Sequence, residues 1–152
     1  MRIVLNLALA LCLESAVAAD LAESIPPCLA RAGSGYTVSH KLAPHALQGD
    51  FDGDGKPDLA VLVTRGREQG VVVCRGGTPP ASVLGAGIPF NEMKDLDFTA
   101  WRIHPASRKV GRGATARRPP SLAGDALYLE WESASAIVYW NGKRFAWYQQ
   151  GD

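Results

Sequence analysis

Four aspartates follow one another at short, regular intervals in the first half of the chain. They stand at relative positions 1, 3, 5 and 9 of one loop and are Asp50, Asp52, Asp54 and Asp58. Ca²⁺ binds about six to eight oxygen ligands, and four carboxylates this close would repel one another without a cation. We therefore predict a calcium site formed by these side chains and the main-chain carbonyl of Lys56, which stands at position 7.

The loop departs from an EF-hand loop at its far end. Gly55 at position 6 permits the sharp turn that such loops require, but position 12 is Val61 rather than a bidentate Glu. The flanking residues are strand-like rather than helical. We therefore expect Asp58 to be a direct ligand, with a water completing the shell. The alternatives are a metal-free turn rich in Asp and Gly and a Mg²⁺ site, which fits less well because Mg²⁺ demands a tight octahedral shell.

Residues 49–61 resemble the Asp-rich core of FG-GAP/VCBS-type repeats, as in the integrin α-subunit propeller. In that family the loop joins two strands of a blade and holds Ca²⁺. The resemblance implies the ligand set Asp50, Asp52, Asp54, Asp58 and the carbonyl of Lys56. A propeller needs several blades of about 40–50 residues, whereas this chain carries one copy of the motif. A small antiparallel sheet or a partial propeller-like fold therefore fits better than a closed propeller.

The remaining polar residues do not form a catalytic pattern. His40, His45 and His104 lack metal-ligand spacing. Glu130 and Glu132 share one face of a predicted strand, but no nucleophile motif accompanies them. We therefore expect no enzymatic activity.

A block of basic residues lies between positions 102 and 118, a segment without any acidic residue. The six residues are Arg102, Arg108, Lys109, Arg112, Arg117 and Arg118. Such a block favours contact with an anionic partner, for example a cell-wall polymer or an acidic protein face. A solvated loop is the alternative. The formal net charge of the chain is only +1, so we expect no nucleic-acid partner.

The first residues have the pattern of an export signal. Arg2 precedes a short apolar run, and small residues follow up to Ala19, where we predict cleavage. Residues 1–19 are thus interpreted as a signal peptide and residues 20–152 as a single exported β domain, periplasmic or secreted; a buried N-terminal helix is the alternative. No stretch is apolar for the roughly 20 residues that a membrane span needs.

Cys28 and Cys74 remain after the predicted cleavage, because the third cysteine, Cys12, lies in the signal. In an oxidising compartment two cysteines favour one disulfide. Two unrelated buried thiols are the alternative.

The elements that must position these residues are mostly strands. The chain has 16 Gly and 10 Pro, and turn-rich composition suits a β fold. We expect a short helix within 20–32, broken at Pro26-Pro27 and ended by Gly33. Strands are predicted at 36–40, 59–64, 70–74, 98–103, 126–132, 135–140 and 143–149, and residues 46–49 lead into the acidic loop. Segment 76–89 is rich in Gly and Pro, and no strand is assigned to it; the basic segment 105–120 is expected to be a loop.

Asn141-Gly142 between two apolar runs predicts a hairpin with a two-residue turn. That turn would pair Trp140 with Lys143 and Val138 with Phe145. Aromatic residues would then lie on both faces of the hairpin, so that one face joins the core and the other forms a second packing layer or a partner surface.

Together these patterns predict an exported calcium-binding module with a structural or partner-binding role. A periplasmic inhibitor or immunity protein, directed against a cell-wall hydrolase or a toxin, is the alternative. Small exported β proteins with a disulfide and no catalytic residues suit that second role as well.

Overall fold

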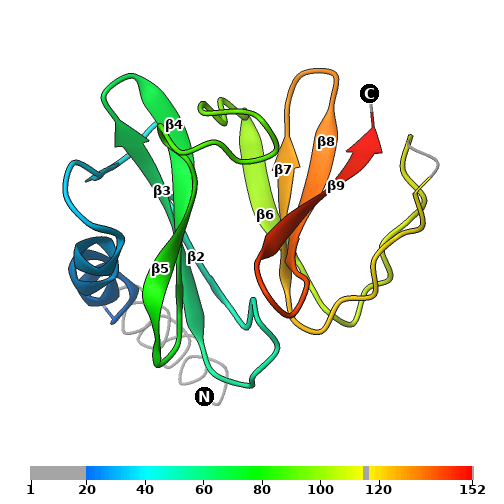
Figure 1. Ribbon diagram of the computed structural model, residues 1–152, viewed down its shortest axis with the longest axis horizontal. Helices are drawn as coiled ribbons and strands as arrows, with labels where there is room; N and C mark the ends of the chain where they lie inside the picture. The colour runs from blue at the N-terminus through cyan, green and yellow to red at the C-terminus, as the bar shows by residue number, and fades with distance from the viewer. Residues whose placement is uncertain (1–19, 115–116, 152) are drawn as a thin grey trace, which may run out of the picture.

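The computed structural model describes residues 20–114 and 117–151. The predicted signal peptide, residues 1–19, lies outside the described residues. The described part of the chain is mostly β, as predicted, with one short helix and two antiparallel sheets (Figure 1).

The first sheet precedes the second in the sequence. Its strands are β1 (Thr37–Val38), β2 (Ala46–Gly49), β3 (Asp58–Arg65), β4 (Glu68–Arg75) and β5 (Thr78–Gly85). β3, β4 and β5 are successive antiparallel neighbours, and β1 and β2 pair with different parts of β3 at the other edge. The turn between β3 and β4 is tight, because the pairing of the two strands continues to Arg65 and Glu68.

The second sheet contains four strands in chain order. They are β6 (Ala100–His104), β7 (Ala126–Glu130), β8 (Ser135–Trp140) and β9 (Phe145–Gly151). The second sheet and the β3–β5 part of the first sheet thus run up and down in chain order, whereas β1 and β2 both pair with β3. Both sheets are open in the part of the chain that the structure describes.

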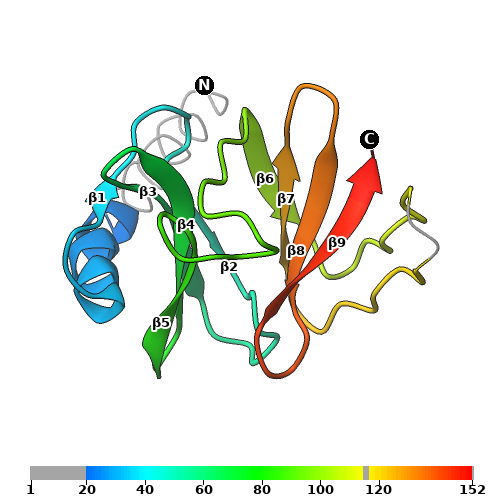
Figure 2. The ribbon, with the colours of Figure 1, turned by 45° about the horizontal axis from the view of Figure 1, so that its top comes forward.

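The main core lies between the two sheets (Figure 2). The first sheet contributes Leu62, Val71 and Val73, and the second contributes Leu127 and Val138. The other face of the first sheet packs against the N-terminal helix. The central strands β3 and β4 are therefore covered on both faces, which explains why their sequences are nearly continuous apolar runs rather than alternating ones.

The described helical residues run from 20 to 32. The predicted break at Pro26-Pro27 is wrong, because the helix continues through both prolines. A proline inside a helix removes one backbone hydrogen bond and costs roughly 3 kcal/mol, and here Ile25 and Cys28 are buried against the first sheet. That packing offsets the loss. The predicted end at Gly33 is confirmed, with φ of 102°. No helix in the described residues has the length and apolar character needed to cross a membrane.

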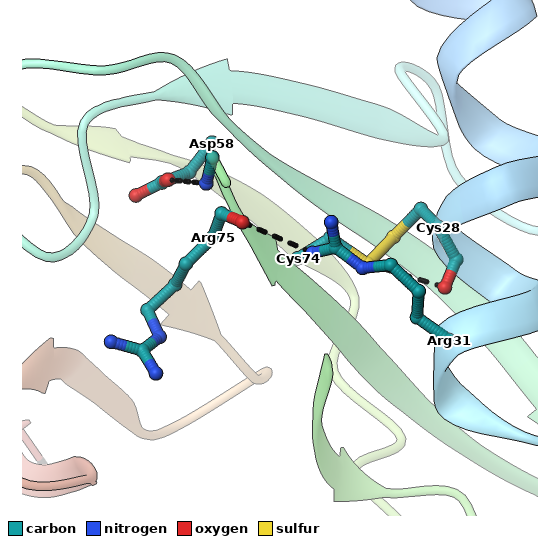
Figure 3. The surroundings of a disulfide bond; sticks show 6 residues. Cys28, Arg31, Asp58, Cys74 and Arg75 are labelled. Atoms are coloured by element: carbon teal, nitrogen blue, oxygen red, sulfur yellow. Dashed lines mark hydrogen bonds between the residues drawn. A yellow bond between two sulfur atoms is a disulfide. The ribbon is translucent and has the colours of Figure 1, made fainter. Parts of the chain in front are cut away.

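The predicted disulfide between Cys28 and Cys74 is confirmed (Figure 3). It joins the helix to β4 across a sequence separation of 46 residues, with the two Cα atoms 5.7 Å apart. The Arg31 guanidinium, one turn further along the helix, donates to the backbone carbonyl of Arg75 at 3.0 Å. The helix is therefore fixed to β4 at two neighbouring points.

The sequence pattern indicates no strand in the Gly- and Pro-rich segment 76–89, but most of this segment is β5. Pro79 and Pro80 lie in that strand, which is tolerated because β5 is an edge strand with no partner required on its outer side. The basic segment 105–120 lies outside the strands, as predicted, among its described residues. Its Val110 packs against Ile137 and Tyr148 and covers the outer face of the second sheet.

The hairpin of β8 and β9 forms as predicted, but its register differs by two residues. Trp140 pairs with Phe145, so four residues rather than two connect the strands. The Asn141 side-chain oxygen accepts the backbone N–H groups of Lys143 and Arg144, each at 3.0 Å, and this stabilises the longer loop. Because the shift is even, each side chain keeps its predicted face.

Candidate metal centre

The acidic loop connects β2 to β3 and ends at Asp58, the first residue of β3. Figure 3 shows Asp58 beside Arg75, which ends the neighbouring strand β4, and close to the disulfide. The rigid end of a buried strand pair therefore positions the last carboxylate of the loop.

Asp50, the first residue of the acidic loop, accepts hydrogen bonds from the backbone of the turn that follows it. Its Oδ1 accepts the N–H groups of Gly53 at 2.8 Å and Asp54 at 3.0 Å, and its Oδ2 accepts that of Gly55 at 2.9 Å. The backbone between positions 53 and 55 is thereby wrapped around one carboxylate. The positive φ of Gly53 and Gly55 permits this tight path.

Asp58 closes the loop from the other end and is only 2% exposed. Its Oδ2 accepts the N–H groups of Phe51 at 2.7 Å and Asp52 at 3.2 Å, and its Oδ1 accepts that of Gly76 at 2.6 Å. Burial raises the pKa of this carboxyl group above its ordinary value; the hydrogen bond from Gly76 opposes the rise, and the charge of Asp52 adds to it. Burial and the neighbouring charge of Asp52 therefore make the ionised form of Asp58 costly.

Three of the predicted ligands converge. One carboxylate oxygen from each of Asp50, Asp52 and Asp58 lies within 4.8 Å of the others. Asp54 is not a member of this group; its Oδ1 accepts the N–H of Lys56 at 2.8 Å, and its Oδ2 lies 3.9 Å from the Lys56 ammonium group. The loop thus brings together its first, second and last carboxylates.

Arg75 is a counter-charge that the sequence reasoning missed. Its Nη1 lies 3.3 Å from Asp52 Oδ2, and the two side chains are 18% and 7% exposed. Its guanidinium also lies 4.2 Å from the ring centroid of Trp140 in the second sheet. The buried Nε of Arg75 has no hydrogen-bond partner among the described residues. One positive charge therefore neutralises part of the cluster and links it to the other sheet.

Asp125 is a further acidic residue that contacts the loop and that the sequence reasoning missed. Its Oδ2 accepts the N–H of Asp50 at 3.2 Å and its Oδ1 accepts that of Ala106 at 2.9 Å, while its own N–H donates to the Asp50 carbonyl at 2.6 Å. Asp50 and Asp125 are 75 residues apart in the sequence, so this hydrogen bond forms only when the two sheets pack together. The entry to β7 therefore braces the acidic loop.

The other residues that the sequence singled out stay apart from this cluster. His40 and His45 form an edge-to-face ring pair with centroids 4.9 Å apart, and His104 Nε2 hydrogen-bonds the Arg108 carbonyl at 3.0 Å. These are packing and loop contacts. Glu130 forms an ion pair with Arg102, with 2.8 Å between Oε2 and Nη1.

The basic block is exposed, with its members Arg108, Lys109, Arg112, Arg117 and Arg118 all on the surface. Arg102 is also exposed, but it stacks over the ring of Tyr128 at 3.9 Å. Five of the six predicted contact residues are thus held by the segment that covers the outer face of the second sheet.

Comparisons of this chain with protein-family models, with curated proteins and with solved structures find no significant match in any of the three.

Proposed function

We propose that this chain is an exported calcium-binding module in which the metal has a structural role. The observation that carries the proposal is the convergence of Asp50, Asp52 and Asp58 within 4.8 Å at the start of a buried strand. The disulfide supports export, because such bonds persist in oxidising compartments.

The chemistry of the donors fits Ca²⁺, which prefers oxygen ligands in a flexible shell. An ionised carboxylate has about four lone-pair sites. Asp50 and Asp58 each accept three N–H groups, and Asp52 accepts one N–H group besides its contact with Arg75. Each of the three therefore keeps capacity for a cation while the loop is held in its curled path.

A structural role is supported by what the loop touches. The loop joins β2 to β3, hydrogen-bonds Asp125 before β7, and contacts Arg75, which stacks on Trp140. A cation bound by the three carboxylates would relieve their repulsion and tighten all of these contacts at once. Calcium should consequently stabilise the folded chain by an amount that grows with the logarithm of its free concentration above Kd.

The test is thermal melting with and without calcium. If Kd lies at the ~10⁻⁴–10⁻³ M typical of extracellular calcium modules, about 10 mM Ca²⁺ stabilises the folded state by about 1–3 kcal/mol. The melting temperature should then rise by roughly 5 °C. Asp52→Asn should abolish the rise, because the amide lacks the negative charge that binds the cation. The loop should keep its shape in this variant, because Asn has the size of Asp and Asp52 accepts only one backbone N–H.

Asp97→Asn is the matched control, because Asp97 is an exposed aspartate that pairs with Lys41 away from the loop. It should keep the full calcium-induced rise. A wild-type protein that melts at the same temperature in calcium and in chelator would overturn the proposal.

A further inference from the structure

β5 and β9 are each an outer strand of their sheet (Figures 1 and 2). Residues of both strands line a cleft of about 570 Å³. Its lining includes three consecutive residues of each strand, namely Ser82, Val83 and Leu84 from β5 and Phe145, Ala146 and Trp147 from β9. We refer to it as the edge cleft. It shares no lining residue with the acidic loop.

The lining shows that the backbone edges of both strands border this cleft. Successive side chains of a strand point to opposite faces of the sheet. Three consecutive residues can therefore line one cleft only where the cleft runs along the edge of the strand. β5 pairs with β4 and β9 pairs with β8, and no further described strand pairs with either of them. Both walls thus present backbone N–H and C=O groups that a further extended chain can use.

The charge of the edge cleft has one sign. Arg117 and Arg144 line it and are exposed, whereas no Asp or Glu is among its lining residues. The hydroxyl of Tyr148, in β9, donates to the Arg117 carbonyl at 3.2 Å, which holds that residue against the strand. Phe90 and Trp147 form an edge-to-face pair with ring centroids 6.1 Å apart and add an apolar wall.

We propose that the edge cleft binds an extended, acidic peptide segment of a partner protein. Main-chain hydrogen bonds to the free strand edges supply affinity for any extended chain. Arg117 and Arg144 select for acidic side chains, because guanidinium groups pair well with carboxylates. The apolar wall accepts the intervening side chains. This proposal does not depend on calcium, since it involves none of the loop carboxylates.

The test uses a synthetic peptide of about eight alternating Val and Glu residues, a length typical of a strand. Calorimetric titration into the wild-type protein should show saturable binding. A second peptide has the same sequence but carries methyl groups on alternate backbone nitrogens. It should not bind, because it keeps its charge but cannot form the hydrogen bonds of an added strand. Replacement of every Glu by Gln in the peptide should weaken binding, as should the double variant Arg117→Glu, Arg144→Glu, by about tenfold.

Arg67→Glu is the matched control, because Arg67 is exposed in the turn between β3 and β4 and does not line the cleft. It should bind the peptide as the wild type does. The absence of any binding, equal binding of the N-methylated peptide, or equal weakening by Arg67→Glu would each overturn the proposal. So would sedimentation showing that the wild type is a dimer and that the double variant Arg117→Glu, Arg144→Glu is a monomer, because a second copy would then occupy the cleft. The peptide comparisons use unaltered protein, so they remain decisive if a variant fails to fold.

Discussion

At the residue scale, the acidic loop is held by its own carboxylates before any cation is considered. Asp50 and Asp58 together accept six backbone N–H groups. Such bonds to charged acceptors are stronger than those between neutral groups. These hydrogen bonds hold the negatively charged carboxylates close together. Arg75 is the positive side chain that contacts one of them, Asp52. Arg75 and a bound metal ion would therefore compete to neutralise the carboxylates of the site.

Replacement of Arg75 by Gln tests that balance. Loss of the guanidinium removes a positive charge that repels an incoming cation, so calcium affinity should rise about threefold to tenfold. The melting temperature in chelator should fall, because Asp52 loses its ion-pair partner. Melting curves recorded in chelator and at increasing calcium concentrations measure both the melting temperature and the calcium affinity. Arg67→Gln is the control. An unchanged calcium affinity would show that Arg75 and the cation do not compete.

The pH dependence follows from the raised pKa of Asp58, caused mainly by its burial. Because the pKa is higher in the folded than in the unfolded chain, Asp58 contributes stability to the calcium-free protein that is full below the ordinary Asp pKa and lost as pH rises through the raised value. Calcium binds the ionised form, so the calcium-induced rise in melting temperature should grow over the same interval. Melting from about pH 4 to pH 7 tests this; a rise that stays constant across the range would contradict it.

At the element scale, the acidic loop depends on close approach of the segment before β7. A Cβ atom on Gly124 would lie 2.3 Å from the Asp50 carbonyl, and one on Gly53 would lie 2.5 Å from the Ala123 carbonyl. Both distances are far shorter than a carbon–oxygen contact allows. The two glycines therefore let the loop dock where Asp125 can hydrogen-bond it.

Gly124→Ala should destabilise the fold by about 1–3 kcal/mol, the usual cost of forcing extra atoms into a packed site. Gly111→Ala is the matched control, since a Cβ there meets no atom within 4 Å. Urea denaturation in calcium-free buffer measures the difference. Equal midpoints for the two variants would contradict the close docking of the loop.

The elements also show what sequence reasoning can and cannot reach. The apolar runs of β3 and β4 and the Asn141-Gly142 turn gave correct strands, because local pattern determines them. The register of the last hairpin was wrong, since the Asn141 side chain stabilises a four-residue loop. The pattern of segment 76–89 does not indicate β5, because prolines are uncommon in strands and are tolerated here only at a sheet edge.

The candidate metal site also has a part that the sequence predicts and a part that only the fold reveals. The four aspartates were found because they lie within nine residues of sequence. Arg75 reaches the loop only through the pairing of β3 with β4, and Asp125 only through the packing of the two sheets. Neither carries a local sequence signal that would have identified it.

At the scale of the whole molecule, the chain forms three layers, with the first sheet between the helix and the second sheet (Figures 1 and 2). The disulfide fixes the helix to β4, next to Asp58 at the end of the acidic loop (Figure 3). The covalent link and the loop therefore support the same end of the first sheet.

Removal of the disulfide by the double variant Cys28→Ala, Cys74→Ala should lower the free energy of unfolding by about 4 kcal/mol, as chain entropy gives for a loop of this length. Urea denaturation measures the change. Reducing agent should destabilise the wild type to a similar degree and leave the double variant unaffected. A loss of less than about 1 kcal/mol would mean that helix packing alone holds the first layer.

The most direct test of the central claim is calorimetric titration of Ca²⁺ into the calcium-free protein. We predict one site per chain with a Kd of ~10⁻⁴–10⁻³ M, lost in Asp52→Asn and kept in Asp97→Asn. Absence of binding up to about 10 mM Ca²⁺, or identical binding by wild type and Asp52→Asn, would contradict a calcium site at Asp50, Asp52 and Asp58.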